Sequence, residues 1–114
     1  MIIPNRIRLS TMVTKKFQTI KNRTGITPNI LSRIALMKAL ESGATLNNAG
    51  VGDAEGQEIS RDVMFGEYVH AYNLLLSQFI SEANSDQQPA EIISALIEIG
   101  AHKIGHTKQI VDLL

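Results

Sequence analysis

Helical spacing of apolar residues, bounded by start and stop signals, is the feature that most constrains this chain. The first apolar stripe recurs at intervals of four, four and three residues and consists of Leu9, Val13, Phe17 and Ile20. Ser10 can cap the free amides at its start, and Gly25 can end it in the left-handed conformation. We therefore predict a helix over residues 11–24, with a narrow buried seam and a broad exposed surface.

The second helical segment has the clearest start signal. Thr27 can cap the helix, and Pro28 stands at the first helical position, where its missing N–H costs nothing. With Gly43 as its stop, this helix is predicted to run to about Ser42. The stretch over residues 34–40 is apolar on nearly every side, so the helix is either a subunit interface or a central core helix.

Two more helices are expected in the second half of the chain. The first is predicted over residues 65–81 by an apolar stripe of period 3.6, made of Phe65, Tyr68, Val69, Tyr72, Leu75, Leu76, Phe79 and Ile80. The second begins near Pro89, and its apolar face is made of Ile92, Ile93, Leu96, Ile97, Gly100 and Ile104. A small residue at Gly100 would allow close helix contact. We interpret the aromatic residues as core rather than as platforms for nucleobases.

One strand signal and one loop complete the expected fold. Residues 6–10, RIRLS, alternate between polar and apolar, which predicts a short strand with Ile7 and Leu9 inward. The expected fold class is mainly α: a single four-helix domain over residues 1–114 with a short N-terminal strand. It would comprise a basic strand–helix–helix part (1–43), a loop (44–64) and an acidic helical part (65–114).

The amino-acid composition excludes several classes of protein. The 114 residues suit one domain, and 44% of them are hydrophobic, as in ordinary globular proteins. Cysteine is absent, which excludes a disulfide scaffold, a thiol nucleophile, an iron–sulfur cluster and a persulfide carrier. No apolar run approaches the ~20 residues of a membrane helix, and the first residues lack a secretory signal. We expect a soluble, cytoplasmic protein that does not bind membranes.

The net charge of zero hides a strong segregation of charge along the chain. Residues 1–40 contain no acid and eight bases: Arg6, Arg8, Lys15, Lys16, Lys21, Arg23, Arg33 and Lys38. Residues 41–114 contain eleven acids and only three bases. Such asymmetry favours a polyanion-binding end. The alternative is two solvated faces that attract each other within or between subunits.

Candidate catalytic and metal-binding residues are few. Glu98, His102 and His106 are spaced by four, which on one helix would align three zinc ligands. Glycines interrupt that segment, so we expect solvent or interface histidines. The carboxylate pairs Asp53/Glu55 and Glu58/Asp62 could hold magnesium, but we interpret them as solvated acids. No nucleophile motif is present. We therefore expect no enzymatic activity, no metal and no cofactor.

The basic half resembles a ribbon-helix-helix unit. The residues that carry the resemblance are RIRLS at 6–10, GITPNI at 25–30 and SRIA at 32–35. In such proteins two chains pair their strands antiparallel, and the ribbon enters the major groove. The resemblance implies that Arg6 and Arg8 face DNA. It also implies that the start of the second helix, near Asn29, presents its free amides to a phosphate.

A closer resemblance covers nearly the whole chain. The segments IPNRIRLS at 3–10, TGITPN at 24–29, RIA at 33–35 and GEY at 66–68 are similar to the DndE family of DNA sulfur modification proteins. The resemblance implies a small bacterial, tetrameric, mainly helical protein of the DNA phosphorothioation system. It further implies binding of double-stranded DNA, with a preference for nicked DNA, through surface lysines. Lys15, Lys16 and Lys21 would then contact phosphates.

The resemblance also implies partners. The sulfur chemistry of the pathway belongs to a cysteine desulfurase, an iron–sulfur ATP-pyrophosphatase-like protein and an SMC-like ATPase, so a chain without cysteine would be a non-catalytic DNA-binding subunit. The predicted DNA-binding residues are Arg6, Arg8, Lys15, Lys16, Lys21, Arg23, Asn29 and Arg33. The alternative functions are a ribbon-helix-helix transcriptional repressor, a protein-binding adaptor of the same complex and a magnesium-dependent nuclease.

Overall fold

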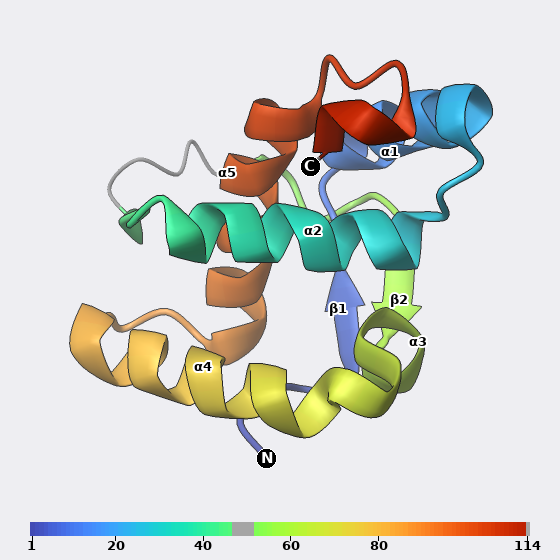
Figure 1. The fold of residues 1–114 in the computed structure, drawn as a ribbon. Helices are drawn as coiled ribbons and strands as arrows, with labels where there is room; N and C mark the ends of the chain where they lie inside the picture. Colours follow the sequence, from blue (N-terminus) through green and yellow to red (C-terminus); the bar gives the residue numbers. More distant parts are fainter. Residues whose placement is uncertain (47–51, 114) are drawn as a thin grey trace.

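A computed structural model describes residues 1–46 and 52–113 of the chain (Figure 1). The elements in chain order are β1 (Arg6–Arg8), α1 (Thr11–Thr24), α2 (Pro28–Glu41), β2 (Glu58–Ser60), α3 (Arg61–Phe65), the 3₁₀ helix η2 (Gly66–Tyr68), α4 (Val69–Ala83), α5 (Pro89–Ile104) and the 3₁₀ helix η3 (Ile110–Leu113). The prediction of a mainly α fold with four long helices and a short N-terminal strand is confirmed. None of the helices in these two described ranges is long and apolar enough to cross a membrane.

Helices α2 and α5 form the centre of the molecule. They pack more extensively on each other than any other pair of elements, and Gly100 of α5 lies against the backbone of Ala35 in α2. The close contact predicted for Gly100 is therefore confirmed. The buried residues of α2 include Leu31, Ala35, Leu36 and Ala39. Of the two alternatives for this helix, a subunit interface or a central core helix, the face that carries these residues is core.

Helix α1 begins and ends where its capping residues predict. Ser10 caps α1, because its Oγ accepts a hydrogen bond from Val13 N at 3.1 Å. Gly25 ends the helix in the left-handed region with φ of 80°. Phe17 and Ile20 are fully buried together with Val13, so the outer surface of α1 is left to its polar and basic residues.

The N-terminal strand pairs within its own chain. β1 is antiparallel to β2, with Ile7 opposite Ile59 and Arg8 opposite Glu58. Ile7 is buried and Arg8 exposed, as the alternation predicts. At the other edge of β1, Ser94 Oγ of α5 donates a hydrogen bond to Arg8 O at 2.7 Å. This pairing takes the place of the ribbon between two chains that the ribbon-helix-helix resemblance implies.

The prediction of a loop over residues 44–64 is wrong for residues 58–64, which lie in β2 and α3. Each element is too short to give a periodic signal of its own. β2 has three residues and is ordered by β1, whereas α3 has five residues and is capped by Ser60, whose Oγ accepts from Val63 N at 3.3 Å. Residues 47–51 of the predicted loop lie outside the described residues.

The third predicted helix is broken at its start. Gly66, with φ of 53°, ends α3 and begins η2, and α4 begins only at Val69. Tyr72 is half-buried with its ring centroid 4.9 Å from that of Phe65, and this burial raises the pKa of the Tyr72 hydroxyl. Elsewhere the predicted core stripe is only partly buried, because Tyr68 is 52% exposed and Leu75 is 43% exposed.

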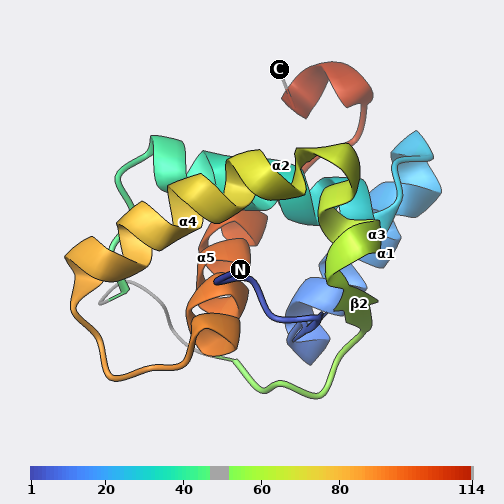
Figure 2. The same ribbon diagram turned by 90° about the horizontal axis from the view of Figure 1, so that it is seen from below.

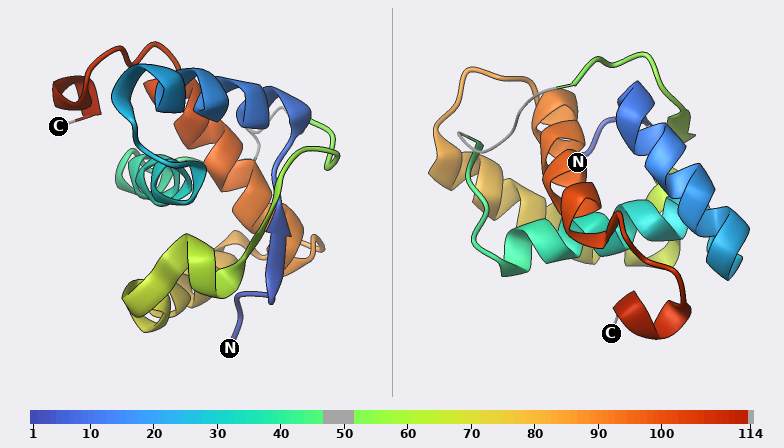
Figure 3. Two further views of the ribbon diagram at one scale, coloured as in Figure 1. Left: turned by 90° about the vertical axis from the view of Figure 1, so that its right-hand side faces the viewer. Right: turned by 90° about the horizontal axis from the view of Figure 1, so that it is seen from above.

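The two outer helices lie on opposite sides of the centre. Figures 1 and 3 show α1 at one end of the molecule and α4 at the other, with α2 between them. Figure 2, from below, shows α4 in front of α2. Leu74, which is 74% exposed, adds to the apolar outer surface of α4. The basic helix and this apolar surface therefore belong to different faces.

Candidate nucleic-acid interface

Four of the predicted residues share one helix and form what we call the α1 basic surface: Lys15, Lys16, Lys21 and Arg23. Lys15, Lys21 and Arg23 are exposed, and Lys16 is half-buried. The helix contains no acidic residue. Within residues 1–46 and 52–113, no carboxylate lies at ion-pair distance from these four side chains. Their charges are therefore available to a polyanion.

The C-terminal end of α5 adjoins this surface. Lys16 Nζ lies 3.1 Å from His102 Nδ1, so the ammonium can donate a hydrogen bond to the neutral imidazole. His102 and its neighbour Lys103 are both exposed. Figure 3 shows the end of α5 on the same side of the molecule as α1. Sequence spacing did not identify His102 as part of this surface, because its partner is 86 residues away.

The two arginines of β1 are partly neutralised. Arg6 Nη1 lies 3.4 Å and Arg8 Nη2 3.2 Å from the carboxylate of Glu58 on β2. Arg8 Nη1 also donates to Gly56 O at 3.0 Å. These ion pairs are exposed and therefore weak, but they leave one net positive charge where two were expected.

Asn29 and Arg33 lie beside α3 and η2 rather than beside the α1 basic surface. Asn29 Nδ2 donates to Val63 O at 3.2 Å, and its Oδ1 accepts from Thr27 Oγ1. Thr27 therefore makes no side-chain cap, contrary to the prediction. The guanidinium carbon of Arg33 lies 5.8 Å from the ring centroid of Tyr68. The eight predicted residues thus fall into three groups rather than one patch.

The candidate metal ligands do not converge. In the described part of the chain, no three histidine, aspartate or glutamate side chains are placed to hold a metal ion. Asp53 instead accepts hydrogen bonds from Thr11 N at 2.9 Å, from Glu55 N at 2.9 Å and from Thr11 Oγ1 at 2.8 Å. These bonds, with that from Thr11 N first, lower the pKa of the Asp53 carboxyl. Asp53 therefore serves to hold residues 52–57 against the start of α1.

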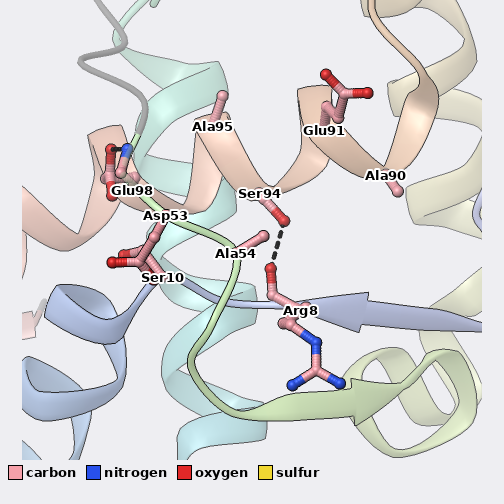
Figure 4. A pocket seen from close by; sticks show the side chains of 10 residues that line it. Arg8, Ser10, Asp53, Ala54, Ala90, Glu91, Ser94, Ala95 and Glu98 are labelled. Carbon is pink, nitrogen blue, oxygen red and sulfur yellow. Dashed lines mark hydrogen bonds between the residues drawn. The ribbon is translucent and has the colours of Figure 1, made fainter.

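A cavity of about 150 Å³ lies between the end of β1, residues 52–54 and α5 (Figure 4). Three of its lining residues are acidic: Asp53, Glu91 and Glu98. Glu98 is buried; its Oε2 accepts from Gly52 N at 3.0 Å, while Oε1 has no hydrogen-bond partner in the described residues and is covered by the chain. The acidic lining repels phosphate, and the covered oxygen is out of reach of a ligand, so this cavity is not the nucleic-acid site.

Comparisons with known proteins agree on one family. The model of the family described as DNA sulphur modification protein DndE matches residues 6–111. The fold is similar to the crystal structure of DndE from Escherichia coli B7A, which is described as involved in DNA phosphorothioation modification. That similarity has a TM-score of 0.76 at 27% identity and covers 91% of this chain and 99% of that chain.

A second solved structure has the same fold. It is that of a mutant DndE described as involved in DNA phosphorothioation, with a TM-score of 0.72 at 23% identity over 90% of this chain and 98% of that chain. No curated protein matches the chain in sequence. Because the family model spans nearly all of the chain, and the structure has the DndE fold, the chain belongs to the DndE family of DNA sulphur modification proteins.

Proposed function

We propose that this protein is a non-catalytic subunit of the phosphorothioation machinery that holds double-stranded DNA, including nicked DNA, on the α1 basic surface. The observation that carries the proposal is the α1 helix itself. Its four basic side chains share one rigid element that contains no acid, and no described carboxylate neutralises them. The similar Escherichia coli protein, involved in DNA phosphorothioation modification, supports a role in the same process.

The mechanism is electrostatic. Lysine and arginine side chains displace the counterions condensed on the phosphates, and their release into solution favours binding. A 14-residue helix is about 21 Å long, so α1 can lie along several phosphates of a duplex at once. Contacts of this kind position a protein on DNA without reading its sequence.

Assembly into a homo-oligomer, with a tetramer favoured, is part of the proposal. Tyr68 of η2 and Leu74 and Leu75 of α4 are exposed apolar residues, and Figure 1 shows α4 at the opposite end of the molecule from α1. Burying these residues between copies would leave each α1 basic surface open and multiply the phosphate contacts.

The double variant Leu74→Glu/Leu75→Glu is expected to lower the molar mass in solution to that of one chain, because the charges oppose burial of the α4 face. Light scattering after size-exclusion chromatography measures the mass. Leu76→Glu is not a suitable variant, since Leu76 is buried in the core. An unchanged oligomer in the double variant would contradict the assignment of this interface.

Glu58→Gln is expected to raise duplex-DNA affinity by up to about fivefold, provided that Arg6 and Arg8 contact phosphate, because it removes the carboxylate that both arginines face. The further change of both arginines to alanine should lower affinity for all DNA sequences alike. Fluorescence anisotropy with a labelled duplex measures both. A loss confined to one base position would instead indicate base readout.

The phosphorothioation partners are proposed from the family. A desulfurase, an ATP-pyrophosphatase-like protein and an SMC-like ATPase would carry out the sulfur chemistry, while this chain holds the DNA or a nicked intermediate. The absence of cysteine supports this division, because the chain itself cannot carry a persulfide.

A gel-shift comparison of intact, nicked and single-stranded DNA across salt concentrations tests the proposal. We expect retardation of duplex DNA, strongest for nicked DNA, with log affinity falling against log salt at roughly −0.9 per phosphate contacted. Tight binding to a single operator would indicate a repressor instead. Failure to retard DNA at physiological salt would indicate an adaptor, and cleavage of plasmid with magnesium would indicate a nuclease.

A further inference from the structure

The contact between Lys16 and His102 joins two groups with different charge behaviour. The Lys16 ammonium is a permanent cation near neutral pH, whereas imidazole side chains gain or lose a proton between about pH 5 and 8. At 3.1 Å, Nδ1 of His102 must be unprotonated to accept the hydrogen bond from Nζ. The contact therefore exists in only one protonation state of His102.

Protonation of His102 reverses the interaction. The imidazolium cannot accept the hydrogen bond, and it repels the ammonium beside it. Lys16 then loses its only hydrogen-bond partner within residues 1–46 and 52–113, and its flexible side chain is free to move outward. His102 also gains a positive charge at an exposed position next to the α1 basic surface. Both changes add to the charge that a phosphate backbone would meet.

No carboxylate of residues 1–46 and 52–113 forms an ion pair with His102. Along the chain its neighbours are Lys103 on α5 and His106 just beyond the end of the helix, whereas Glu98 is turned away to Gly52. Ser42 and Gly43, which directly follow α2, line the hollow beside His102, and neither residue has a titratable group. From α1 comes Lys16 itself. In the described part of the molecule, no carboxylate lies at ion-pair distance from His102, so a bound phosphate could pair with its protonated ring without displacing one.

We propose that His102 is a proton-linked phosphate contact of the α1 basic surface: DNA binding draws a proton onto His102, which releases Lys16 to the phosphates and adds a second cation beside it. This inference rests on the proposed function and names an additional residue of the same surface. By linkage, a ligand that binds the protonated form more tightly must bind more tightly as the pH falls.

The experiment is a duplex-DNA affinity series from pH 8 to pH 6 at constant ionic strength, using the full chain. Wild-type affinity should rise about three- to tenfold over these two pH units, which is below the roughly hundredfold limit for the uptake of one proton. His102→Gln should lose most of this rise because its amide can accept from Lys16 but cannot be protonated. His102→Lys should bind tightly at both pH values because its charge is permanent.

His106→Gln is the matched control. His106 lies four residues further along the chain, beyond the end of α5. The pKa of the Asp112 carboxyl is lowered mainly by hydrogen bonds from Lys108 N and Gln109 N, and in smaller part by the charge of His106. We expect this variant to keep the wild-type pH dependence. In nuclear magnetic resonance, the titration midpoint of the His102 ring protons should move to higher pH when a duplex is added.

The outcomes separate this inference from the proposed function. Duplex binding that is independent of pH, or a pH dependence that His102→Gln retains in full, would overturn the role of His102 and leave the α1 basic surface standing. Failure to bind duplex DNA at any pH would overturn both.

Discussion

Replacing Lys15, Lys16 and Lys21 together by glutamate is expected to weaken duplex-DNA binding at least about a hundredfold near physiological salt. The change moves the charge of α1 by six units, so three favourable phosphate contacts become three repulsive ones. These side chains lie outside the buried stripe of Val13, Phe17 and Ile20, so the fold should remain. Fluorescence anisotropy measures the affinity, and circular dichroism checks the helix content.

The matched control changes the same three lysines to arginine. This variant keeps the charge and should keep most of the affinity, although the geometry of each contact differs. The glutamate variant should also show a salt dependence shallower by about three units of slope, if three contacts are lost. Unchanged affinity in a folded glutamate variant, or an equal loss in the arginine variant, would refute the assignment of these lysines.

Gly100→Ala is expected to have the largest effect on stability, a loss of at least about 3 kcal/mol in the free energy of unfolding. An added methyl group would overlap the carbonyl group of Ala35 and lie 2.6 Å from its Cα. Relief requires α2 and α5, the two central helices, to move apart and lose contacts along their length. Thermal unfolding should show a midpoint lower by more than about 10 °C.

Gly25→Ala separates this packing effect from the ordinary cost of replacing a glycine. Gly25 has φ of 80° and no neighbouring atom within 4 Å of a Cβ built there. Its replacement should therefore cost only the backbone strain of about 1 kcal/mol. If Gly100→Ala proved no more destabilising than Gly25→Ala, the close packing of α2 and α5 would be wrong.

The parts of the fold that follow from neighbouring residues were predictable. The N-cap at Ser10 and the glycine stop at Gly25 both lie within a few residues of the helix they bound, and α1 has the predicted ends. Pro89 likewise begins α5. Local signals of this kind act through the backbone of one helix and do not depend on the rest of the chain.

The parts of the fold that depend on residues far away in the sequence were not predictable. β2 has three residues and exists because β1, at least 50 positions earlier in the sequence, pairs with it. The apolar stripe over residues 65–81 predicts the helix from Val69 onward, but periodicity shows neither the break at Gly66 nor the exposure of Tyr68 and Leu75. Likewise, Thr27 has the residue type of a cap, yet its hydroxyl contacts Asn29 instead.

In the candidate site, too, the local features were predictable and the contacts between distant residues were not. The sequence alone shows that residues 1–40 are basic, and four of these basic residues lie on helix α1. The carboxylate of Glu58 beside Arg6 and Arg8 comes from the acidic half, and so does His102 beside Lys16. Charge segregation along the chain therefore overstates the separation of charges in space.

The most direct test of the DNA-binding surface is a nuclear magnetic resonance titration of the ¹⁵N-labelled protein with a short nicked duplex. Amide signals of residues 11–24 and of the end of α5 around His102 should shift, while those of α4 should not. Shifts confined to α4 or to the acidic cavity around Glu98, or no shifts at saturating duplex, would contradict the account.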